Sequence, residues 1–317
     1  EELDDYFAKG LITDKYGNPF LKKEALNEWQ LKEAQVLTEL KAKNVPSPIN
    51  RDYLWTGKLT PFAHQKETAA FLTLNKKAFC FNEQGTGKTA SAIWASDYLL
   101  NQGKINRVLV ICPLSIMESA WRNDLFSFAM HRKVDVAYGS AKKRREIIAG
   151  DADYVIINYD GVEIVQDAVA EGGFDLIIVD EATHYKNVQT KRWKTLNKLI
   201  NKDTWLWMMT GTPAAQSPLD AYGLAKLIDP QSVPRFFGSF RDMVMTKVTQ
   251  FRWVVKPTAS DLVFNILQPA IRFTKEECLD LPDMTYTNRH VELTRQQKKY
   301  YNTLKKSMTM TVGDDEV

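Results

Sequence analysis

The sequence predicts an α/β protein: a parallel sheet with helices on both faces. Between Leu59 and Pro230, short runs of β-forming residues alternate with stretches of helical periodicity, a pattern typical of parallel strands joined by crossover helices. Several runs are apolar almost throughout, as expected for central strands buried on both faces. The predicted strands are residues 78–82, 107–113, 134–138, 154–159, 174–180 and 205–210.

Length and composition indicate a folded protein. The chain has 317 residues, 44% of them hydrophobic, which is enough for one large or two medium domains. A net charge of +3 gives no indication of nucleic-acid binding, so any basic surface must be local. Cys80, Cys112 and Cys278 are widely spaced, which favours neither a disulfide framework nor a zinc site and fits a reducing cytoplasm. No apolar run approaches the ~20 residues of a membrane span.

Changes in composition divide the chain into three parts. Residues 22–43 are rich in Ala, Leu, Glu and Lys at helical spacing, which predicts an N-terminal helical appendage over residues 1–50. The alternating pattern predicts the α/β lobe over residues 51–231. In residues 232–317 the alternation gives way to aromatic and basic residues, and we expect an extension and linker there.

A phosphate-binding loop is predicted at residues 82–89, Asn-Glu-Gln-Gly-Thr-Gly-Lys-Thr, between an apolar run and a helical stretch at residues 90–100. In such a loop, backbone N–H groups converge on the phosphates, Lys88 reaches the β/γ oxygens, and the Thr89 hydroxyl ligates Mg²⁺. Asn82 stands where the general motif has its first glycine. We expect ATP binding; the alternative is a chance glycine-rich turn. The expected nucleotide contacts in the loop are Gln84, Gly85, Thr86, Gly87, Lys88 and Thr89.

Paired carboxylates end the predicted strand at residues 174–180. Asp180 is expected to hold Mg²⁺, directly or through water, and Glu181 to orient and deprotonate the water that attacks the γ-phosphate. Alone, an Asp-Glu pair after a strand is equally typical of an acidic turn or a helix cap. Following Lys88 and Thr89 in the correct order, the pair predicts ATP hydrolysis, with Lys88, Asp180 and Glu181 as the catalytic residues.

From about Leu59 to Leu304, the chain resembles the Swi/Snf-like branch of superfamily 2 helicases and DNA translocases. The resemblance implies a RecA-like P-loop NTPase fold that uses ATP and Mg²⁺. Gln65, within residues 59–65, matches the family's glutamine that pairs with the adenine edge through its amide. The compact motif spacing looks more like that of a bacterial or bacteriophage member, or of a fork-remodelling branch, than that of a nucleosome remodeller.

Two further motifs resemble the family's contacts to the DNA backbone. Residues 110–115, followed by Trp121, are similar to the first motif, and residues 156–159 are similar to the next. The Lys-Asn pair at residues 186–187 matches the residues that trail the family's acidic box. The DNA-binding residues that the resemblance implies are Pro113, Ser115, Asn158, Tyr159 and Lys186.

The motifs that couple nucleotide state to motion are also matched, with one departure. Thr183 replaces the histidine of the family's Asp-Glu-Ala-His box, and His184 comes one place late. The departure bears on the coupling route and not on Mg²⁺ or water activation. Residues 209–213 resemble the third motif, in which Thr210 and Thr212 would be coupling hydroxyls alongside Thr183. Residues 271–277 and 293–297 look like the family's passage into its second lobe.

Motors of this family place ATP between two RecA-like lobes, and the second lobe supplies an arginine that stabilises the transferring phosphoryl group. A second lobe would need roughly 150 further residues. We therefore expect the first lobe and linker of a longer protein, which hydrolyses ATP only weakly alone. Its expected partners are that lobe and double-stranded DNA, bound without sequence preference. The expected location is the cytoplasm, which is the host cytoplasm for a phage-encoded protein, or the nucleus in a eukaryote, with no membrane contact.

Two other function classes compete with a translocase or strand-separating motor. One is a non-motor P-loop protein, such as a nucleotide-dependent switch or a small-molecule kinase, although a kinase needs a substrate lid and no Thr-Gly-Thr-Pro element. The other is a catalytically silent ATP-binding module that recruits partners through its N-terminal helix. DNA-stimulated hydrolysis separates the motor from both.

Weaker signals have ordinary structural interpretations. The basic run at residues 142–145 and the basic cluster at residues 191–198 are more typical of solvated helix faces than of phosphate contacts. Aromatic and basic residues at 236–253 fit nucleic-acid stacking or a small packed subdomain equally well. Tryptophans in apolar stretches are more typical of the core than of base stacking; these are Trp121, Trp193, Trp205 and Trp207.

Overall fold

The structure, a computed structural model, describes residues 47–57, 59–214, 217–249, 252–278, 292–307, 311–312 and 315–316. It divides the chain into two units, Glu1–Leu279 and Asp280–Val317. The helix predicted for the N-terminal appendage lies outside the described residues. Among the residues described, no helix combines the length and the apolar character needed to cross a membrane.

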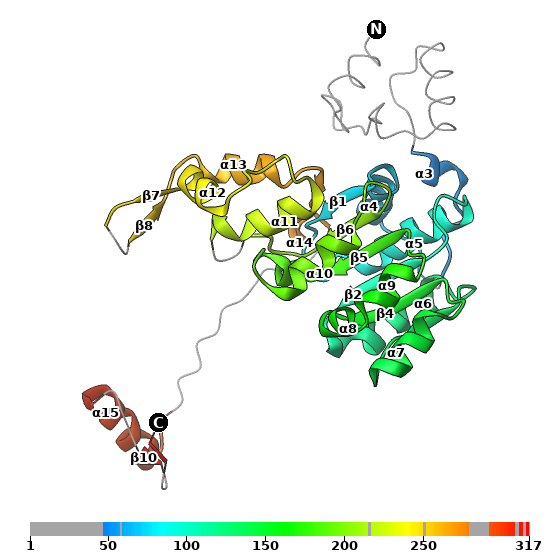
Figure 1. Cartoon of the computed structure of the whole chain (residues 1–317). Coiled ribbons are helices and arrows are strands. Elements are labelled where there is room, and N and C mark those ends of the chain that lie inside the picture. The colour runs from blue at the N-terminus through cyan, green and yellow to red at the C-terminus, as the bar shows by residue number, and fades with distance from the viewer. Residues whose placement is uncertain are drawn as a thin grey trace. The chain divides into compact units, whose positions relative to one another are not determined.

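A seven-stranded sheet forms the centre of the first unit (Figure 1). Its strand order is β3-β4-β2-β5-β6-β1-β9, and every neighbouring pair is parallel. This confirms the predicted fold class and all six predicted strands; the seventh, β9, was not predicted. The strands are β1 Lys77–Cys80, β2 Val108–Cys112, β3 Val134–Val136, β4 Tyr154–Asn158, β5 Leu176–Asp180, β6 Trp205–Met209 and β9 Ala270–Ile271.

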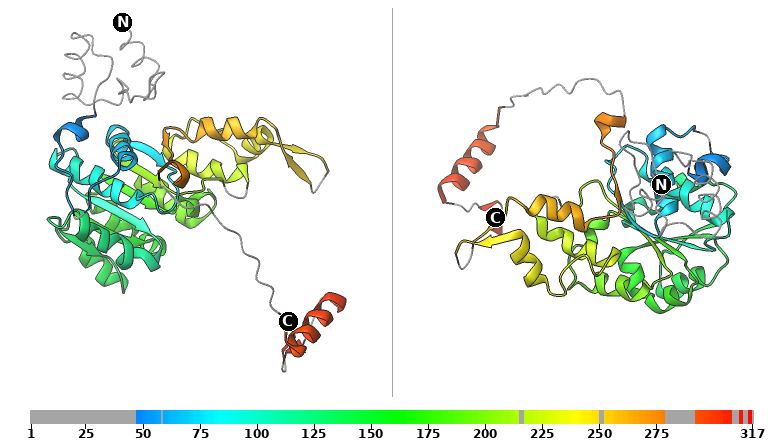
Figure 2. Two further views of the ribbon diagram at one scale, coloured as in Figure 1. Left: turned by 180° about the vertical axis from the view of Figure 1, so that it is seen from behind. Right: turned by 90° about the horizontal axis from the view of Figure 1, so that it is seen from above.

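Helices cover both faces of this sheet, as the views from behind and from above show (Figure 2). Because successive strand residues point to opposite faces, each strand supplies two separate apolar cores. Val108 and Val110 belong to one core, and Leu109 and Ile111 belong to the other. The first core is covered by α3 Pro48–Asp52, α4 Ala63–Leu74, α5 Lys88–Asn101 and α6 Asn123–Phe128. The second is covered by α7 Ala141–Ile148, α8 Tyr159–Ile164, α9 Gln166–Glu171, α10 Lys191–Leu199 and α11 Ala221–Ile228.

The central strands are buried along their whole length. In β2, β4, β5 and β6, every residue is buried, which explains why their sequences are almost continuous apolar runs. Polar residues begin where these strands end. The carboxyl ends of β1, β5 and β6 lie next to one another because these strands are neighbours, and open α/β sheets bind their ligands at such ends.

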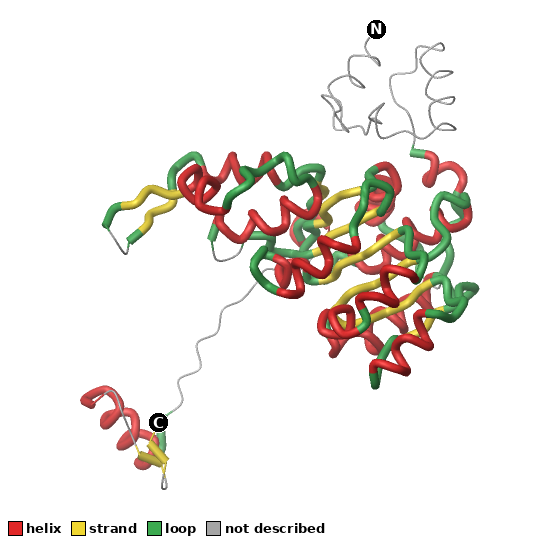
Figure 3. The backbone as a smooth tube through the Cα atoms, in the orientation of Figure 1, coloured by secondary structure: helices red, strands yellow, loops and turns green. Residues whose placement is uncertain are grey.

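A helical extension follows α11 and packs on the second core. It contains α12 Phe237–Val244, the antiparallel hairpin β7 Met245–Lys247 and β8 Trp253–Val255, and α13 Ala259–Ile266. Phe240 and Ile266 join the second core, while the hairpin extends away from the sheet (Figure 3). The predicted three-part division of the chain remains a prediction.

The second unit is small. Its described residues form α15 Arg295–Ser307 and the antiparallel pair β10 Thr311–Val312 and β11 Asp315–Glu316.

Candidate nucleotide-binding site

The predicted phosphate loop joins β1 to α5, and its backbone has the geometry that the glycines allow. Gly85 and Gly87 have φ values of +87° and +82°, a left-handed conformation that glycine adopts without strain. At Gly87 an added Cβ would also collide with the side-chain amide of Gln65. Gly87 is the N-cap of α5, and Lys88 and Thr89 are its first two residues. A glycine N-cap has no side chain to bond the first N–H groups of the helix, so these groups are available to an anion.

Asn82, which stands where the general motif has its first glycine, is fully buried, and its side chain forms hydrogen bonds at both ends of its amide. Its Nδ2 donates a 2.8 Å hydrogen bond to Thr68 Oγ1 on α4. Its Oδ1 accepts a 3.0 Å hydrogen bond from the backbone N–H of Phe273. The side chain therefore fixes the first residue of the loop to α4 and to the segment after β9, two contacts that glycine cannot make.

The first turn of α4 also contacts the loop. His64 is buried, with Nε2 2.9 Å from the carbonyl oxygen of Thr86, which accepts the bond. Gln65 donates from Nε2 to the same oxygen at 3.3 Å and accepts from the Phe62 N–H at 3.0 Å. Gln65 thus lies against the loop, and its predicted pairing with adenine remains a prediction.

The acidic pair lies at the end of β5. Asp180 is buried, its Oδ2 accepts a 2.8 Å hydrogen bond from Trp121 Nε1, and its Oδ1 accepts one from the Glu181 N–H at 3.0 Å. Burial raises the pKa of Asp180, while these two hydrogen bonds and the charge of Lys88 act in the opposite direction. Asp180 of β5 and Cys80 of β1 both pair with Met209 of β6, one on each side, so the acidic pair and the start of the phosphate loop lie at the same edge of the sheet.

Glu181 has an unusual backbone for a residue with a side chain. Its φ of +47° lies in the left-handed region, which costs a non-glycine residue of this kind roughly 1–3 kcal/mol. Such strain concentrates at functional sites. The turn that follows, Ala182–Tyr185, contains Thr183, which is half-buried.

Tyr159, the first residue of α8, supports the acidic pair through a hydrogen bond. Its hydroxyl donates a 2.6 Å hydrogen bond to the carbonyl oxygen of Asp180. The Tyr159 ring lies 4.6 Å from the His184 ring, centroid to centroid, and the Arg192 guanidinium lies 4.7 Å from the ring centroid. Burial, followed by the charge of Arg192, lowers the pKa of His184. The His184 ring thus packs, tilted, against the tyrosine that supports the site.

The predicted coupling segment rests on the phosphate loop. Thr210 is buried, and its N–H donates to the Cys80 carbonyl at the end of β1 at 3.0 Å. Thr210 Oγ1 accepts a 3.3 Å hydrogen bond from the N–H of Thr212, which is exposed. At Gly211, an added Cβ would lie 3.7 Å from backbone atoms of residues 82–84. The neighbouring ends of β1, β5 and β6 therefore bring the three predicted motifs together, although the coupling role of the threonines remains a prediction.

The five residues expected to contact DNA differ in exposure. Ser115 is exposed and Pro113 is half-buried at the turn after β2. Asn158 and Tyr159 are buried, and Asn158 Oδ1 accepts a 2.9 Å hydrogen bond from Arg144 Nη1. Lys186 lies 3.2 Å from Asp220 Oδ2 in an ion pair. Their roles at DNA remain predictions, and the burial of Asn158 and Tyr159 favours support of the site over direct contact.

Arg144 corrects the interpretation of the basic run as a solvated face. It is buried and donates to the carbonyl oxygens of Ala137 and Gly139 at 2.7 and 3.0 Å, in addition to Asn158. These acceptors compensate for burying the guanidinium. Lys142 and Lys143 are exposed. The tryptophans are buried, as predicted; they are Trp121, Trp193, Trp205 and Trp207.

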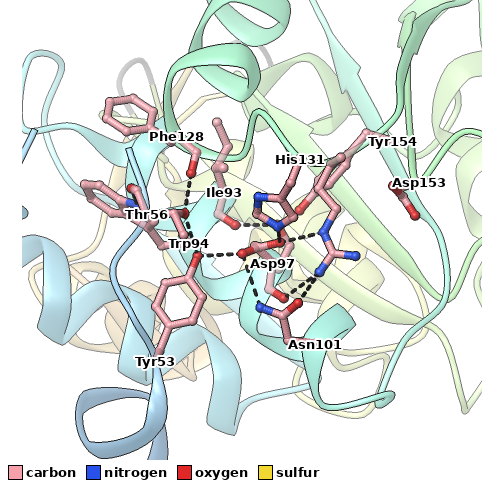
Figure 4. A network of polar contacts seen from close by, with 12 residues as sticks. Tyr53, Thr56, Ile93, Trp94, Asp97, Asn101, Phe128, His131, Asp153 and Tyr154 are labelled. Carbon is pink, nitrogen blue, oxygen red and sulfur yellow. Dashed lines mark hydrogen bonds and ion pairs between the residues drawn. The ribbon is translucent and has the colours of Figure 1, made fainter. Parts of the chain in front are cut away.

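A second buried carboxylate fixes the helix that begins at the phosphate loop (Figure 4). Asp97 of α5 is fully buried. Its Oδ2 accepts from the Tyr53 hydroxyl at 2.7 Å, and its Oδ1 lies 2.9 Å from His131 Nε2 and 2.6 Å from Arg132 Nε. No pattern in the sequence predicts this cluster, because its members come from separate segments. It ties α5 to the chain before α4 and to the loop before β3.

A RecA-like sheet with a glycine loop after β1, an acidic pair after β5 and a threonine segment after β6 defines a P-loop NTPase. A sequence model of the SNF2-related domain matches residues 30–316. The chain therefore belongs to the SNF2-related family, which confirms the resemblance described above.

Individual relatives agree with this assignment. Protein p41 of Acyrthosiphon pisum secondary endosymbiont phage 1 is 24% identical over 276 residues, covering 81% of this chain and 60% of p41. The Drosophila melanogaster SWI/SNF-related matrix-associated actin-dependent regulator of chromatin subfamily A-like protein 1 is 26% identical over 172 residues, covering 54% of this chain and 22% of that protein. The solved Sulfolobus solfataricus SWI2/SNF2 ATPase core in complex with dsDNA matches with a TM-score of 0.61 and 22% identity, covering 80% of this chain and 55% of that one. The chain thus spans less than two thirds of each.

Proposed function

We propose that this chain is the first, ATP-binding lobe of a DNA-dependent ATPase that translocates along double-stranded DNA. The observation that carries the proposal is the juxtaposition of Lys88 with Asp180. Lys88 begins the helix after the loop that leaves β1, and Asp180 ends β5. Cys80 of β1 and Asp180 both pair with Met209 of β6. Glu181 has a left-handed backbone. A cation and two carboxylates at the ends of neighbouring strands are the groups that phosphoryl transfer from ATP to water requires.

Each residue has a role that its position supports. Lys88, at the start of α5, binds the β/γ-phosphate oxygens together with the first N–H groups of that helix. Glu181 follows the buried Asp180 and is only partly buried, which suits a base that orients and deprotonates an attacking water. Gln65 contacts the adenine edge, and Thr210 and Thr212 transmit nucleotide state from the loop on which they rest.

Magnesium fits the oxygen donors at this site. Asp180 supplies a carboxylate and Thr89 a hydroxyl, and Mg²⁺ commonly takes one or two protein oxygens, with phosphates and water completing its shell. The described residues contain no cluster of three His, Cys, Asp or Glu side chains that would suit a metal with an all-protein shell. Burial raises the pKa of Asp180, and a bound cation would keep this carboxylate ionised. Magnesium would neutralise charge on the phosphates.

DNA is the proposed partner on the exposed edge near Ser115 and Lys186. The Sulfolobus core with a similar fold was solved in complex with dsDNA, which supports this choice. Contacts to the phosphate backbone carry no sequence information, so binding is expected to be sequence-independent and to weaken with salt. A second RecA-like lobe completes the ATP site in the proposed motor and supplies its arginine. The isolated lobe therefore binds ATP but turns it over slowly.

ATPase activity, with no DNA, duplex DNA or single-stranded DNA, tests the proposal. It is measured for residues 1–317 and for a chain extended through the proposed second lobe, with Lys88→Ala of each as the blank. Turnover stimulated by duplex DNA in the extended chain alone is the expected result. Equal, unstimulated turnover in both chains would instead support a non-motor P-loop protein. ATP binding without turnover in either would support a silent ATP-binding module.

A further inference from the structure

We propose that Lys275 is a second phosphate-binding lysine of the nucleotide site, held over the phosphate loop by the segment at residues 271–275. This inference rests on the proposed ATP binding. We name residues 271–275 the strap. It begins at Ile271, the last residue of β9, lies within the same unit as the loop, and is distant from the loop in sequence.

The strap continues the sheet ladder alongside the loop. β9 pairs in parallel with β1, with Phe79 opposite Ala270 and Cys80 opposite Ile271. Beyond the end of β1, the Phe81 N–H donates to the Ile271 carbonyl at 2.8 Å, and the Glu83 N–H donates to the Phe273 carbonyl at 2.9 Å. The strap is thus bonded to the backbone of the loop's first residues as a further strand would be.

Two side chains of the loop strengthen this attachment. Asn82 Oδ1 accepts from the Phe273 N–H at 3.0 Å, and Glu83 Oε2 accepts from the Lys275 N–H at 3.1 Å. The Phe273 ring lies 5.8 Å from the ring of buried His64, which itself bonds the loop. Two backbone and two side-chain hydrogen bonds therefore hold the strap to the loop.

The end of the Lys275 side chain lies over the loop. An added Cβ at Gly85 would be 3.6 Å from Lys275 Cε, so the last carbon before the ammonium is next to a glycine expected to contact phosphate. The residue before Lys275 is held as well, because Glu277 Oε2 accepts from the N–H and the hydroxyl of Thr274 at 2.7 and 3.0 Å. Only the side chain is left to move, and it is exposed.

Negative charge at the phosphate loop favours a cation at this position. Glu83 places a carboxylate beside the loop, and a bound triphosphate adds further negative charge. Lys88 is the cation that the motif itself supplies, and Lys275 adds another from the strap. A lysine ammonium near phosphate forms charge-assisted hydrogen bonds, which are stronger than neutral ones.

Arg272 is the matched control within the strap. It is exposed and carries the same charge. The hydrogen bonds from Thr274 lower the pKa of Glu277, and the charge of Arg272 lowers it further. A general loss of positive charge from the strap would therefore affect both variants, whereas a specific phosphate contact would affect only Lys275.

Isothermal titration of residues 1–317 with ATP–Mg²⁺ tests the inference. Lys275→Ala is expected to raise Kd about tenfold, the size of losing one hydrogen bond to a charged group. The Kd of Arg272→Ala should stay within about twofold of that of the parent chain, because Lys275 is still present. Lys275→Arg should bind ATP nearly as tightly as the parent chain, because arginine keeps a cation over the loop. The thermal unfolding midpoint without nucleotide should not change in either alanine variant.

The outcomes separate the inference from the proposed function. If the parent chain binds ATP and Lys275→Ala binds it equally well, Lys275 is not a phosphate ligand. Equal losses in Lys275→Ala and Arg272→Ala would show a general charge effect and would also overturn the inference. If the parent chain binds no better than its Lys88→Ala variant, the proposed ATP site itself fails, and the role of Lys275 fails with it.

Discussion

The indole Nε1 of Trp121 donates a 2.8 Å hydrogen bond to Oδ2 of Asp180. Trp121 is fully buried and lies in a π-helical turn, Met117–Arg122, a distortion that often occurs at functional sites. This turn begins just after Ser115, which is expected to contact DNA. One side chain therefore connects the proposed DNA-contact motif to the carboxylate proposed to hold Mg²⁺.

Replacing Trp121 with Phe should remove the hydrogen bond that connects the proposed DNA-contact motif to Asp180. Phenylalanine retains much of the apolar packing but cannot donate to Asp180. Because that hydrogen bond lowers the pKa of Asp180, its loss should raise this pKa, so the carboxylate protonates at a higher pH. The acid limb of the pH profile of kcat/KM, which reports the free enzyme, should shift to higher pH in the two-lobed chain.

Trp193→Phe is the control for the loss of an indole. Trp193 is also buried, but its Nε1 donates to the Gly223 carbonyl at 2.8 Å, in the packing of α10 against α11. This variant should lose stability to a similar extent and leave the acid limb unchanged. A profile that is identical in Trp121→Phe and the parent chain would show that the indole only packs against the carboxylate.

Gly87→Ala should abolish ATP binding. The added Cβ would collide with the Gln65 side-chain amide, and φ of +82° is strained for alanine. Gly103→Ala is the matched control, because Gly103 also has a positive φ of +64° but has open space around it. That variant should lose about 1 kcal/mol of stability and bind ATP normally. Equilibrium titration and urea unfolding of both variants check the two expectations.

The Asp97 cluster should be a major contributor to stability. Asp97→Asn would leave Arg132, whose side chain is only 15% exposed, without its carboxylate, and breaking a buried ion pair costs about 3–5 kcal/mol. Lys133→Ala is the control, because its ion pair with Asp151 is largely exposed and should change stability by less than about 1 kcal/mol. Urea unfolding at neutral pH measures both. Similar losses in the two variants would mean that Asp97 contributes no more than a surface pair.

The sequence predicted those parts of the molecule that depend on contiguous patterns. The central strands are fully buried, so their apolar runs were clear without the structure. The phosphate loop and the acidic pair are short motifs whose spacing is set by local backbone geometry. β9 was not predicted, because two residues following a proline carry too little pattern to identify a strand.

Contacts between distant polar residues could not be predicted in this way. In the sequence, Asn82 is only a poor match to the loop motif. Its role depends on a hydrogen bond to Phe273, 191 residues away, which only the structure shows. Arg144 belongs to a basic run, and nothing in that run indicates that three oxygens accept from its guanidinium inside the lobe. Trp121 was expected in the core, but its polar partner, 59 residues away, depends on the tertiary fold.

Glu181→Gln should separate ATP binding from hydrolysis. Glutamine keeps the size of the side chain but cannot accept a proton from water, and loss of a general base costs typically 10²–10⁴ in rate. In the two-lobed chain, kcat with duplex DNA should fall by about that factor while ATP affinity stays within about twofold of the parent. Asp160→Asn is the control, because Asp160 is an exposed carboxylate paired with Arg192 on the same side of the sheet; its kcat should not change. If Glu181→Gln retained full turnover, another group would have to activate the water, and the strained backbone at Glu181 would then serve only to end β5 and orient the turn that contains Thr183.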